Sequence, residues 1–268
     1  MRFEEKGSGR PVVFIHGNFA SRAWWREVLS VFPSGSNSVF PSGSNSVFPS
    51  GSNQPPKGYR FLAVDLPGFG ETPFQGESPT ISGFAQAVLA FLEEEGLEPV
   101  LVGHSLGGAV AMEAAGQAPD RVRGLVLLDS APPTGFPTPE AYYPLLESYR
   151  QDRQALRTAL LGVIGRPPPY FEELVDQAQA MHPGHFTGNA RALAEWKLTR
   201  VYPGPVLVVH GEKDPLVPLA MAEITRAFFP KARLHVLPGL GHSPQLEDPG
   251  GFLNVLEGFL EEVPWGSS

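Results

Sequence analysis

The sequence predicts an α/β fold, in which a mostly parallel twisted sheet of about seven strands carries helices on both faces and a helical cap as an insertion. The first observation is an alternation along the chain: short apolar runs of the kind that form buried strands are separated by longer segments with helical periodicity. The second is a break in that rhythm between residues 131 and 201, where prolines, aromatic residues and helical patterns occur without a convincing strand. A chain of 268 residues is long enough for one large core of this kind.

Each expected strand is a run rich in Val, Leu, Ile or Phe that is bounded by Gly, Pro or polar residues. We expect strands at residues 12–15, 61–64, 100–102, 125–128, 206–209 and 234–237, with a short edge strand at 2–5. We expect helices at residues 23–30, 81–94, 105–117, 221–229 and 250–261. Residues 1–132 and 201–268 then form the core, and residues 133–200 form the helical cap between two strands of the same sheet.

Residues 31–54 differ in composition from the rest of the chain. The unit Val-Phe-Pro-Ser-Gly-Ser-Asn-Ser occurs at 31–38 and again at 39–46, and a third copy ends with Gln54. We interpret the segment as a tandem duplication, or an engineered or copying artefact, that forms a mobile loop. The alternative is a self-associating segment built on the Val-Phe pairs. Because this loop joins a helix to the next strand, it should lie at the sheet edge opposite the ligand-binding edge and leave the chemistry intact.

The segment Gly103-His104-Ser105-Leu106-Gly107 places a serine between two glycines, where an apolar run meets a helix of small residues. This order of strand, turn and helix predicts a nucleophile elbow, a tight turn that exposes the serine hydroxyl. Glycines are needed at both positions because side chains would collide where the chain reverses. The alternative is a glycine-rich turn in which the serine has no role.

A serine nucleophile needs a general base, and the base needs an acid that orients it. Asp214 follows the expected strand at 206–209, and His242 follows the expected strand at 234–237. Both loops should lie at the same sheet edge as Ser105, so we expect Asp214 to hold His242 and His242 to take the serine proton. Asp129, at the end of its own strand, is the rival acid.

The tetrahedral intermediate of acyl transfer needs backbone N–H donors for its oxyanion. We expect one donor to be the N–H of Leu106, at the start of a helix whose dipole favours negative charge. The second should come from the loop His16-Gly17-Asn18-Phe19, where we expect the Asn18 N–H, with the Phe19 N–H as the alternative. An ordinary βα turn without a ligand role is the competing interpretation of that loop.

Five motifs in order along the chain resemble those of the α/β-hydrolase family: His16-Gly17, Asp65-Leu66-Pro67-Gly68-Phe69-Gly70, Gly103-His104-Ser105-Leu106-Gly107-Gly108, Asp214 and Gly241-His242. The resemblance implies a mostly parallel sheet with a variable cap, and the short N-terminus implies that the family's first strand is missing. The serine disfavours haloalkane dehalogenases and epoxide hydrolases, which use an aspartate. Cofactor-free haloperoxidases and perhydrolases, carbon–carbon bond hydrolases and lactonases share the Ser-Asp-His set and stay open.

The cap is expected to set substrate choice. We expect Phe19, beside the oxyanion donors, and Trp196, in the cap, to contact the substrate. Most of the cap aromatics should instead form the cap's own core; they are Phe136, Tyr142, Tyr143, Tyr149, Tyr170, Phe171, Phe186 and Trp196.

Composition narrows the function further. The net charge of −8 argues against nucleic acid and anionic membranes as partners. The chain has no cysteine and no His/Asp/Glu set with metal-ligand spacing, so we expect neither a metal nor another cofactor. The first residues lack an apolar signal core, which predicts a cytoplasmic protein.

The expected function is hydrolysis of a carboxylic ester with a small to medium apolar acyl group, through an acyl-enzyme on Ser105. The expected partner is a small-molecule substrate, and the protein should be a monomer or homodimer. The alternatives are a carbon–carbon bond hydrolase, a lactonase, a perhydrolase or haloperoxidase, and, in another class, a catalytically silent binding protein on the same fold.

Overall fold

The structure is a computed structural model that describes residues 1–30 and 58–265. The repeats at 31–54, and both interpretations of them, lie outside the described residues. Within the described part, seven strands form one sheet in the order β1-β3-β2-β4-β5-β6-β7. Their bounds are β1 (Phe3–Gly7), β2 (Arg10–Ile15), β3 (Tyr59–Val64), β4 (Val100–His104), β5 (Gly124–Leu128), β6 (Val206–Gly211) and β7 (Ala232–Leu237). Only the edge strand β1 runs antiparallel to its neighbour among these pairs, so the predicted fold class is confirmed.

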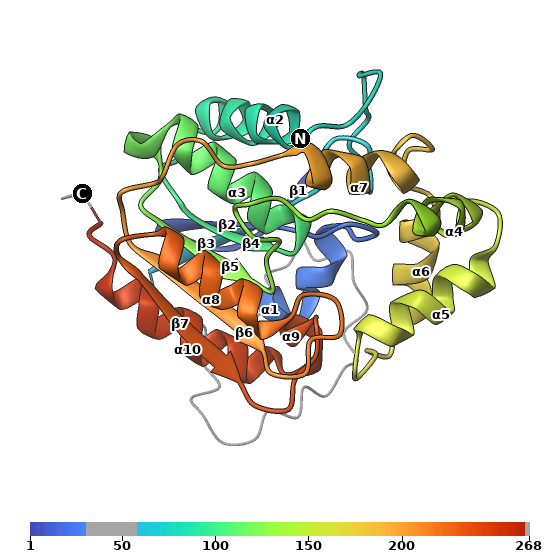
Figure 1. Cartoon of the computed structure of the whole chain (residues 1–268). Coiled ribbons are helices and arrows are strands. Elements are labelled where there is room, and N and C mark those ends of the chain that lie inside the picture. Colours follow the sequence, from blue (N-terminus) through green and yellow to red (C-terminus); the bar gives the residue numbers. More distant parts are fainter. Residues whose placement is uncertain (31–57, 266–268) are drawn as a thin grey trace.

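Helices cover both faces of the sheet (Figure 1), and the alternation of strand residues explains why. On β2, Val13 and Ile15 belong to one buried cluster and Val12 and Phe14 to the other, as the period of two of a strand requires. The first cluster includes residues of α2 (Ile81–Glu94), α3 (Leu106–Gln117) and α8 (Leu219–Phe228). The second includes residues of α1 (Arg26–Ser30) and α10 (Pro249–Glu262).

The stretch between β5 and β6 is helical, as its sequence predicts. It holds the short 3₁₀ helix η3 (Glu140–Tyr142) and the helices α4 (Tyr143–Ser148), α5 (Arg153–Val163), α6 (Phe171–Gln179) and α7 (His185–Glu195). Figure 1 shows α4, α5 and α6 together beyond the sheet, with α7 beside them. We call the segment that holds these helices the cap; its boundaries at residues 133 and 200 stay a prediction.

Two local differences from the expected elements have physical causes. The helix expected at 23–30 is divided into η1 (Arg22–Trp25), a 3₁₀ turn, and α1, and the Ser21 side chain accepts from the Ala23 N–H at the start of η1. The one-turn helix α9 (Pro244–Glu247), just after β7, was not expected. Short helices of this kind depend on capping and packing rather than on periodicity, so sequence patterns do not reveal them. The 3₁₀ turn η2 (Pro119–Arg121) lies between the end of α3 and the start of β5. No described helix is both long enough and apolar enough to cross a lipid bilayer.

Parallel pairing gathers the functional segments at one edge. The loops that follow β2, β4, β5, β6 and β7 all begin at the carboxyl ends of mutually parallel strands. These loops carry the residues that the sequence singled out, including Ser105, Asp214 and His242. The fold therefore brings together side chains that are far apart in the sequence.

Gly107 sets the distance between α3 and β2. A Cβ atom at Gly107 would lie 2.4 Å from the Ile15 carbonyl oxygen and 2.5 Å from that of His16, both of them backbone atoms. We predict that Gly107→Ala lowers the free energy of unfolding by about 1–3 kcal/mol, because the helix must move away from the strand. The matched control is Gly258→Ala in α10, where a Cβ meets nothing within 4 Å. Denaturant unfolding should show that control to be more stable by about 0.5–1 kcal/mol; the same sign for both variants would contradict the argument.

Candidate active site

Ser105 lies between β4 and α3 in strained backbone geometry, with φ 53° and ψ −116°. Such a conformation costs about 1–3 kcal/mol for a residue with a side chain and persists only where its surroundings enforce it. Here the Ser105 N–H donates to the Leu128 carbonyl at 3.0 Å, and the Ser105 carbonyl accepts from the Ala131 N–H at 3.2 Å. A Cβ atom at Gly103 would lie 2.3 Å from the Gly107 carbonyl oxygen, so the turn also needs its glycine. The geometry is that of a nucleophile elbow.

Asp214 and His242 form a buried hydrogen-bonded pair. His242 Nδ1 lies 2.7 Å from Asp214 Oδ2, and the two side chains are 4% and 1% exposed. The other carboxylate oxygen of Asp214 accepts the N–H groups of Leu216 and Val217 at 2.8 and 2.9 Å. Burial opposes ionisation of Asp214, but the hydrogen bond and charge of His242 and these backbone donors outweigh it and lower its pKa. A carboxylate that accepts from Nδ1–H leaves Nε2 as the proton acceptor of the imidazole.

Two residues hold the His242 loop: Glu247, which the sequence did not single out, and His104, to which it gave no contact with His242. The Glu247 carboxylate accepts the Gly241 N–H at 2.9 Å and the Ser243 N–H at 3.1 Å, one on each side of His242. His104 Nε2 lies 2.7 Å from the His242 carbonyl oxygen, and the two imidazole rings are 4.9 Å apart. Burial and, next, the charge of His242 lower the pKa of His104 to about 3, so it is neutral and donates Nε2–H. Because His104 precedes Ser105, this contact places the His242 loop beside the elbow.

The Ser105 hydroxyl makes no hydrogen bond with any residue in the described ranges, His242 included. Hydrogen bonds of this kind are often long in ligand-free enzymes and shorten when substrate binds.

The backbone of the loop after β2 also passes close to the elbow. A Cβ atom at Gly17 would lie 3.1 Å from the Ser105 Cβ, so the loop backbone passes close to the serine. The Asn18 N–H makes no hydrogen bond with a residue in 1–30 or 58–265 and is available to a ligand. Leu106 is the first residue of α3, where an N–H has no acceptor within the helix. The alternative donor, the Phe19 N–H, is already bonded to Asn18 Oδ1 at 3.0 Å.

Hydrogen bonds and one partly buried ion pair hold the loop after β2 in place. His16 Nε2 accepts the Leu66 N–H at 3.1 Å, so its Nδ1–H donates to the Gly17 carbonyl at 2.8 Å. Asp65, with no exposed surface, accepts the Arg22 N–H at 2.8 Å and forms an ion pair with the Arg22 guanidinium. Arg22 therefore links the loop after β2 to the loop after β3.

The comparisons with known proteins agree with this architecture. A sequence profile described as the alpha/beta hydrolase family matches residues 12–255. The chain belongs to that family. It is 28% identical over 283 residues to a 2-hydroxymuconate semialdehyde hydrolase of Pseudomonas sp. strain CF600, covering 97% of this chain and 89% of the relative. It is 30% identical over 236 residues to a pimeloyl-[acyl-carrier protein] methyl ester esterase of Neisseria meningitidis serogroup C, covering 78% and 86%. A solved structure of a thermophilic esterase from Thermogutta terrifontis matches with a TM-score of 0.75, 21% identity, and coverage of 97% and 93%.

The two side chains expected to contact substrate in this hydrolase lie in different places. Phe19 packs edge-on between two cap residues, with ring centroids 5.8 Å from Tyr149 and 5.7 Å from Phe186. The Trp196 indole N–H instead donates to Glu113 at 2.9 Å. Glu113 is seven residues along α3 from Leu106, which corresponds to about 10 Å. Phe19 therefore lies between the loop after β2 and the cap, whereas the Trp196 N–H is bound to α3 further from Leu106.

Asp129, the rival acid, contacts His210 rather than His242. Its Oδ1 accepts the Gly211 N–H at 2.8 Å and lies 3.3 Å from His210 Nδ1. Since His210 Nε2 faces the Val217 carbonyl at 2.8 Å, it carries the proton and Nδ1 presents a lone pair. Burial first, and the charge of Asp214 next, raise the pKa of Asp129 well above its ordinary value. Ligand atoms of Asp129, His210 and Asp214 lie within 4.8 Å of one another, a cluster that their separation in the sequence concealed.

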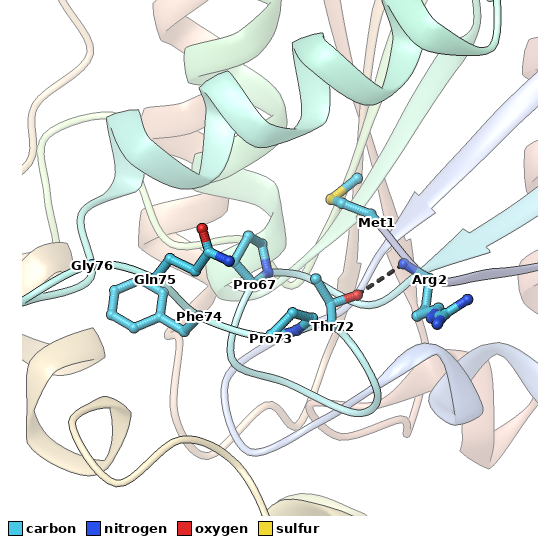
Figure 2. Close-up of a pocket in the computed structure, with 8 residues that line it drawn as sticks. All are labelled: Met1, Arg2, Pro67, Thr72, Pro73, Phe74, Gln75 and Gly76. Carbon is cyan, nitrogen blue, oxygen red and sulfur yellow. Dashed lines mark hydrogen bonds between the residues drawn. The ribbon is translucent and has the colours of Figure 1, made fainter.

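A surface depression of about 600 Å³ lies apart from this arrangement (Figure 2). Its lining comes from Met1 and Arg2 at the N-terminus and from Pro67 and residues 72–76 after β3. Ser105, Asp214 and His242 are not among its lining residues, so the depression is separate from the residues that the sequence singled out.

The raised pKa of Asp129 predicts a pH-dependent effect of Asp129→Asn. Between pH 3.8 and its raised folded-state pKa, Asp129 binds a proton in the folded protein but loses it on unfolding. Stability therefore falls as the pH rises through this range. An asparagine can accept the Gly211 N–H without this penalty. We predict that calorimetry shows a higher Tm for Asp129→Asn than for the native protein at pH 8, and little difference at pH 4. A Tm difference that does not grow with pH would contradict a protonated Asp129.

Glu247→Gln should loosen the His242 loop. Glutamine offers one oxygen where Glu247 uses two, and its NH₂ group would face a backbone N–H. We predict a loss of about 1.5–3 kcal/mol in the free energy of unfolding and a lower kcat. Glu262→Gln is the matched control: its carboxylate pairs with Arg233 on the surface and is 59% exposed. Denaturant unfolding of that control should differ from the native protein by less than about 0.5 kcal/mol.

Proposed function

We propose that this hydrolase cleaves carboxylic esters with small to medium apolar acyl groups through an acyl-enzyme on Ser105. One observation carries the proposal: the strained elbow at Ser105 lies beside the loop that presents His242, and His242 Nδ1 is 2.7 Å from Asp214 Oδ2. A nucleophile, a base and an orienting acid are the three parts that serine-based acyl transfer needs.

The chemistry follows from the roles of these groups. Asp214 accepts from Nδ1–H of His242 and stabilises the imidazolium, while Nε2 takes the Ser105 proton as the hydroxyl attacks the ester carbonyl. The N–H groups of Leu106 and Asn18 bind the oxyanion. His242 then protonates the leaving alcohol, and water attacks the acyl-enzyme with His242 again as the base.

An apolar acyl group fits the surroundings of the oxyanion loop. Phe19, the residue after Asn18, forms an aromatic cluster with Tyr149 and Phe186 of the cap. Phe186 is 1% exposed. Aromatic walls favour an uncharged apolar group over an ionic one. The proposal includes a small-molecule substrate, no cofactor, no nucleic-acid or membrane partner, and a cytoplasmic monomer or homodimer.

A second candidate is hydrolysis of a carbon–carbon bond with the same residues. It is favoured by the similarity to the Pseudomonas hydrolase named for 2-hydroxymuconate semialdehyde. A substrate panel of p-nitrophenyl esters, lactones and 2-hydroxymuconate semialdehyde, with peroxide-dependent halogenation as a further arm, separates the reactions. The first candidate requires the highest kcat/KM on the esters; a clear preference for the semialdehyde would replace it with the second.

Replacing the nucleophile tests the proposal directly. We predict that Ser105→Ala lowers kcat/KM for p-nitrophenyl butyrate by at least about 10⁴-fold. A fluorophosphonate should label the native protein and not Ser105→Ala. Ser148→Ala is the control, because that hydroxyl is exposed in the cap and bonds only to the Leu145 carbonyl. Comparable turnover by Ser105→Ala, or no labelling of the native protein, would refute the mechanism and favour a binding protein.

A further inference from the structure

Asn189 connects the cap to the oxyanion loop. It lies on α7, has no exposed surface, and its Nδ2 donates to Asn18 Oδ1 at 2.8 Å across a separation of 171 residues. The proposed mechanism uses the backbone N–H of Asn18 and gives no role to its side chain. The contact therefore needs an explanation of its own.

The orientation of both amides follows from one backbone donor. Asn18 Oδ1 also accepts the Phe19 N–H at 3.0 Å, and a backbone N–H can only donate. The Asn18 atom at this position is therefore the oxygen and not the amide nitrogen. Asn189 must then present its NH₂ group to that oxygen. Its own oxygen is left buried without a hydrogen bond to any residue that the structure describes.

A buried oxygen without a partner shows that packing alone does not explain Asn189. An apolar side chain of similar size would fill the same space without leaving a buried acceptor unpaired. What the amide supplies is a directed N–H, and that N–H donates to the residue next to Gly17, whose backbone passes close to Ser105. Asn18 is thus held by its side chain while its main-chain N–H stays free.

Other cap residues contact the same short loop. The Ser21 hydroxyl donates to Gln177 of α6, and the Phe19 ring packs against Tyr149 and Phe186. The segment from Asn18 to Ser21 therefore packs against the cap. Of these contacts, the Asn18–Asn189 hydrogen bond is made by the same residue that carries the proposed oxyanion donor.

We propose that Asn189 is a positioning residue for the oxyanion hole, which makes the placement of the Asn18 N–H depend on a docked cap. The inference rests on the proposed function. With Asn189 in place, the Asn18 N–H points toward the developing oxyanion; without its hydrogen bond the loop adopts other orientations. The effect belongs to the transition state, because the ground-state carbonyl needs the donor less.

Steady-state kinetics of Asn189→Ala with p-nitrophenyl butyrate give the first test. We expect kcat to fall about tenfold and KM to change less than about twofold. Arg191→Gln is the matched control on the same helix, because Arg191 contacts Glu140 and Tyr143 within the cap. That control should keep the native kcat. An unchanged kcat for folded Asn189→Ala, or an equal loss in Arg191→Gln, would overturn the inference.

Asn189→Asp adds a pH signature that a merely structural role would not produce. Its ionised carboxylate sets an acceptor against Asn18 Oδ1, whereas its protonated form can donate again. We expect the ratio of its kcat to that of the native protein to rise as the pH falls. A ratio that does not change with pH would contradict the hydrogen bond as the cause.

A double-mutant cycle shows whether Asn189 acts through Asn18. Asn18→Ala removes the contact with Asn189 and also the hydrogen bond from the Phe19 N–H, so it should lower kcat at least as much as Asn189→Ala does. The double variant should lose no more than Asn18→Ala, because the contact between the two amides is already absent. Losses that multiply in the double variant would overturn the inference.

Hydrogen exchange supplies a readout that needs no turnover. The peptide containing Asn18 and Phe19 should exchange faster in Asn189→Ala than in the native protein or Arg191→Gln. Unchanged exchange overturns the positioning role, whether or not esters are substrates. Inactivity of native protein with faster exchange in Asn189→Ala would refute the proposed function alone.

Discussion

The close approach of α3 to the sheet is the constraint on which the rest of the site depends. Gly107 lies against the carbonyl groups of Ile15 and His16, the end of β2 and the start of the loop that carries Asn18. The same turn forces Ser105 into a positive φ and is held by hydrogen bonds to Leu128 and Ala131. One close approach between backbones therefore holds Ser105 and the first turn of α3 next to the loop that carries Asn18. Only glycine allows this approach, because a Cβ atom at position 107 would push α3 away from β2.

Two aspartates at the same sheet edge have pKa values shifted in opposite directions because their surroundings differ. Asp214 receives a hydrogen bond from His242 and two backbone N–H groups, which stabilise its charge despite burial. Asp129 receives one backbone N–H and faces the lone pair of His210 and the charge of Asp214, so burial raises its pKa. Two adjacent carboxyl groups repel each other less when only one of them is ionised than when both are. The raised pKa of Asp129 favours its neutral form, which reduces the repulsion on the charge that Asp214 carries in the proposed mechanism.

Sequence patterns predicted the parts of this molecule that depend on local order. The central strands β4 and β6 are buried apolar runs, and β7 alternates apolar with polar residues. Ser105, Asp214 and His242 each follow one of these strands, so parallel pairing places them at one edge. The supporting contacts were not predictable, because Glu247, His104 and Asn189 act on partners brought to them by the fold. The expected contact of Trp196 with substrate stays a prediction, and the hydrogen bond of its N–H to Glu113 is a partner that the sequence did not indicate. The sequence gives the residue type but not the partner that the fold places against it.

The polar character of the contacts between the cap and the oxyanion loop suits a cover that must also admit substrate. If the cap lifts, water replaces the hydrogen bonds of Asn18 and Ser21 to Asn189 and Gln177, so their net cost is small. Apolar contacts, such as those of Phe19 with Tyr149 and Phe186, lose free energy in proportion to the surface that becomes exposed. The loop combines both kinds: a small aromatic cluster favours the docked cap, and directed amide hydrogen bonds determine the orientation of the loop once the cap is docked. The orientation of the loop and the strength of cap docking can then vary independently, because different side chains determine them.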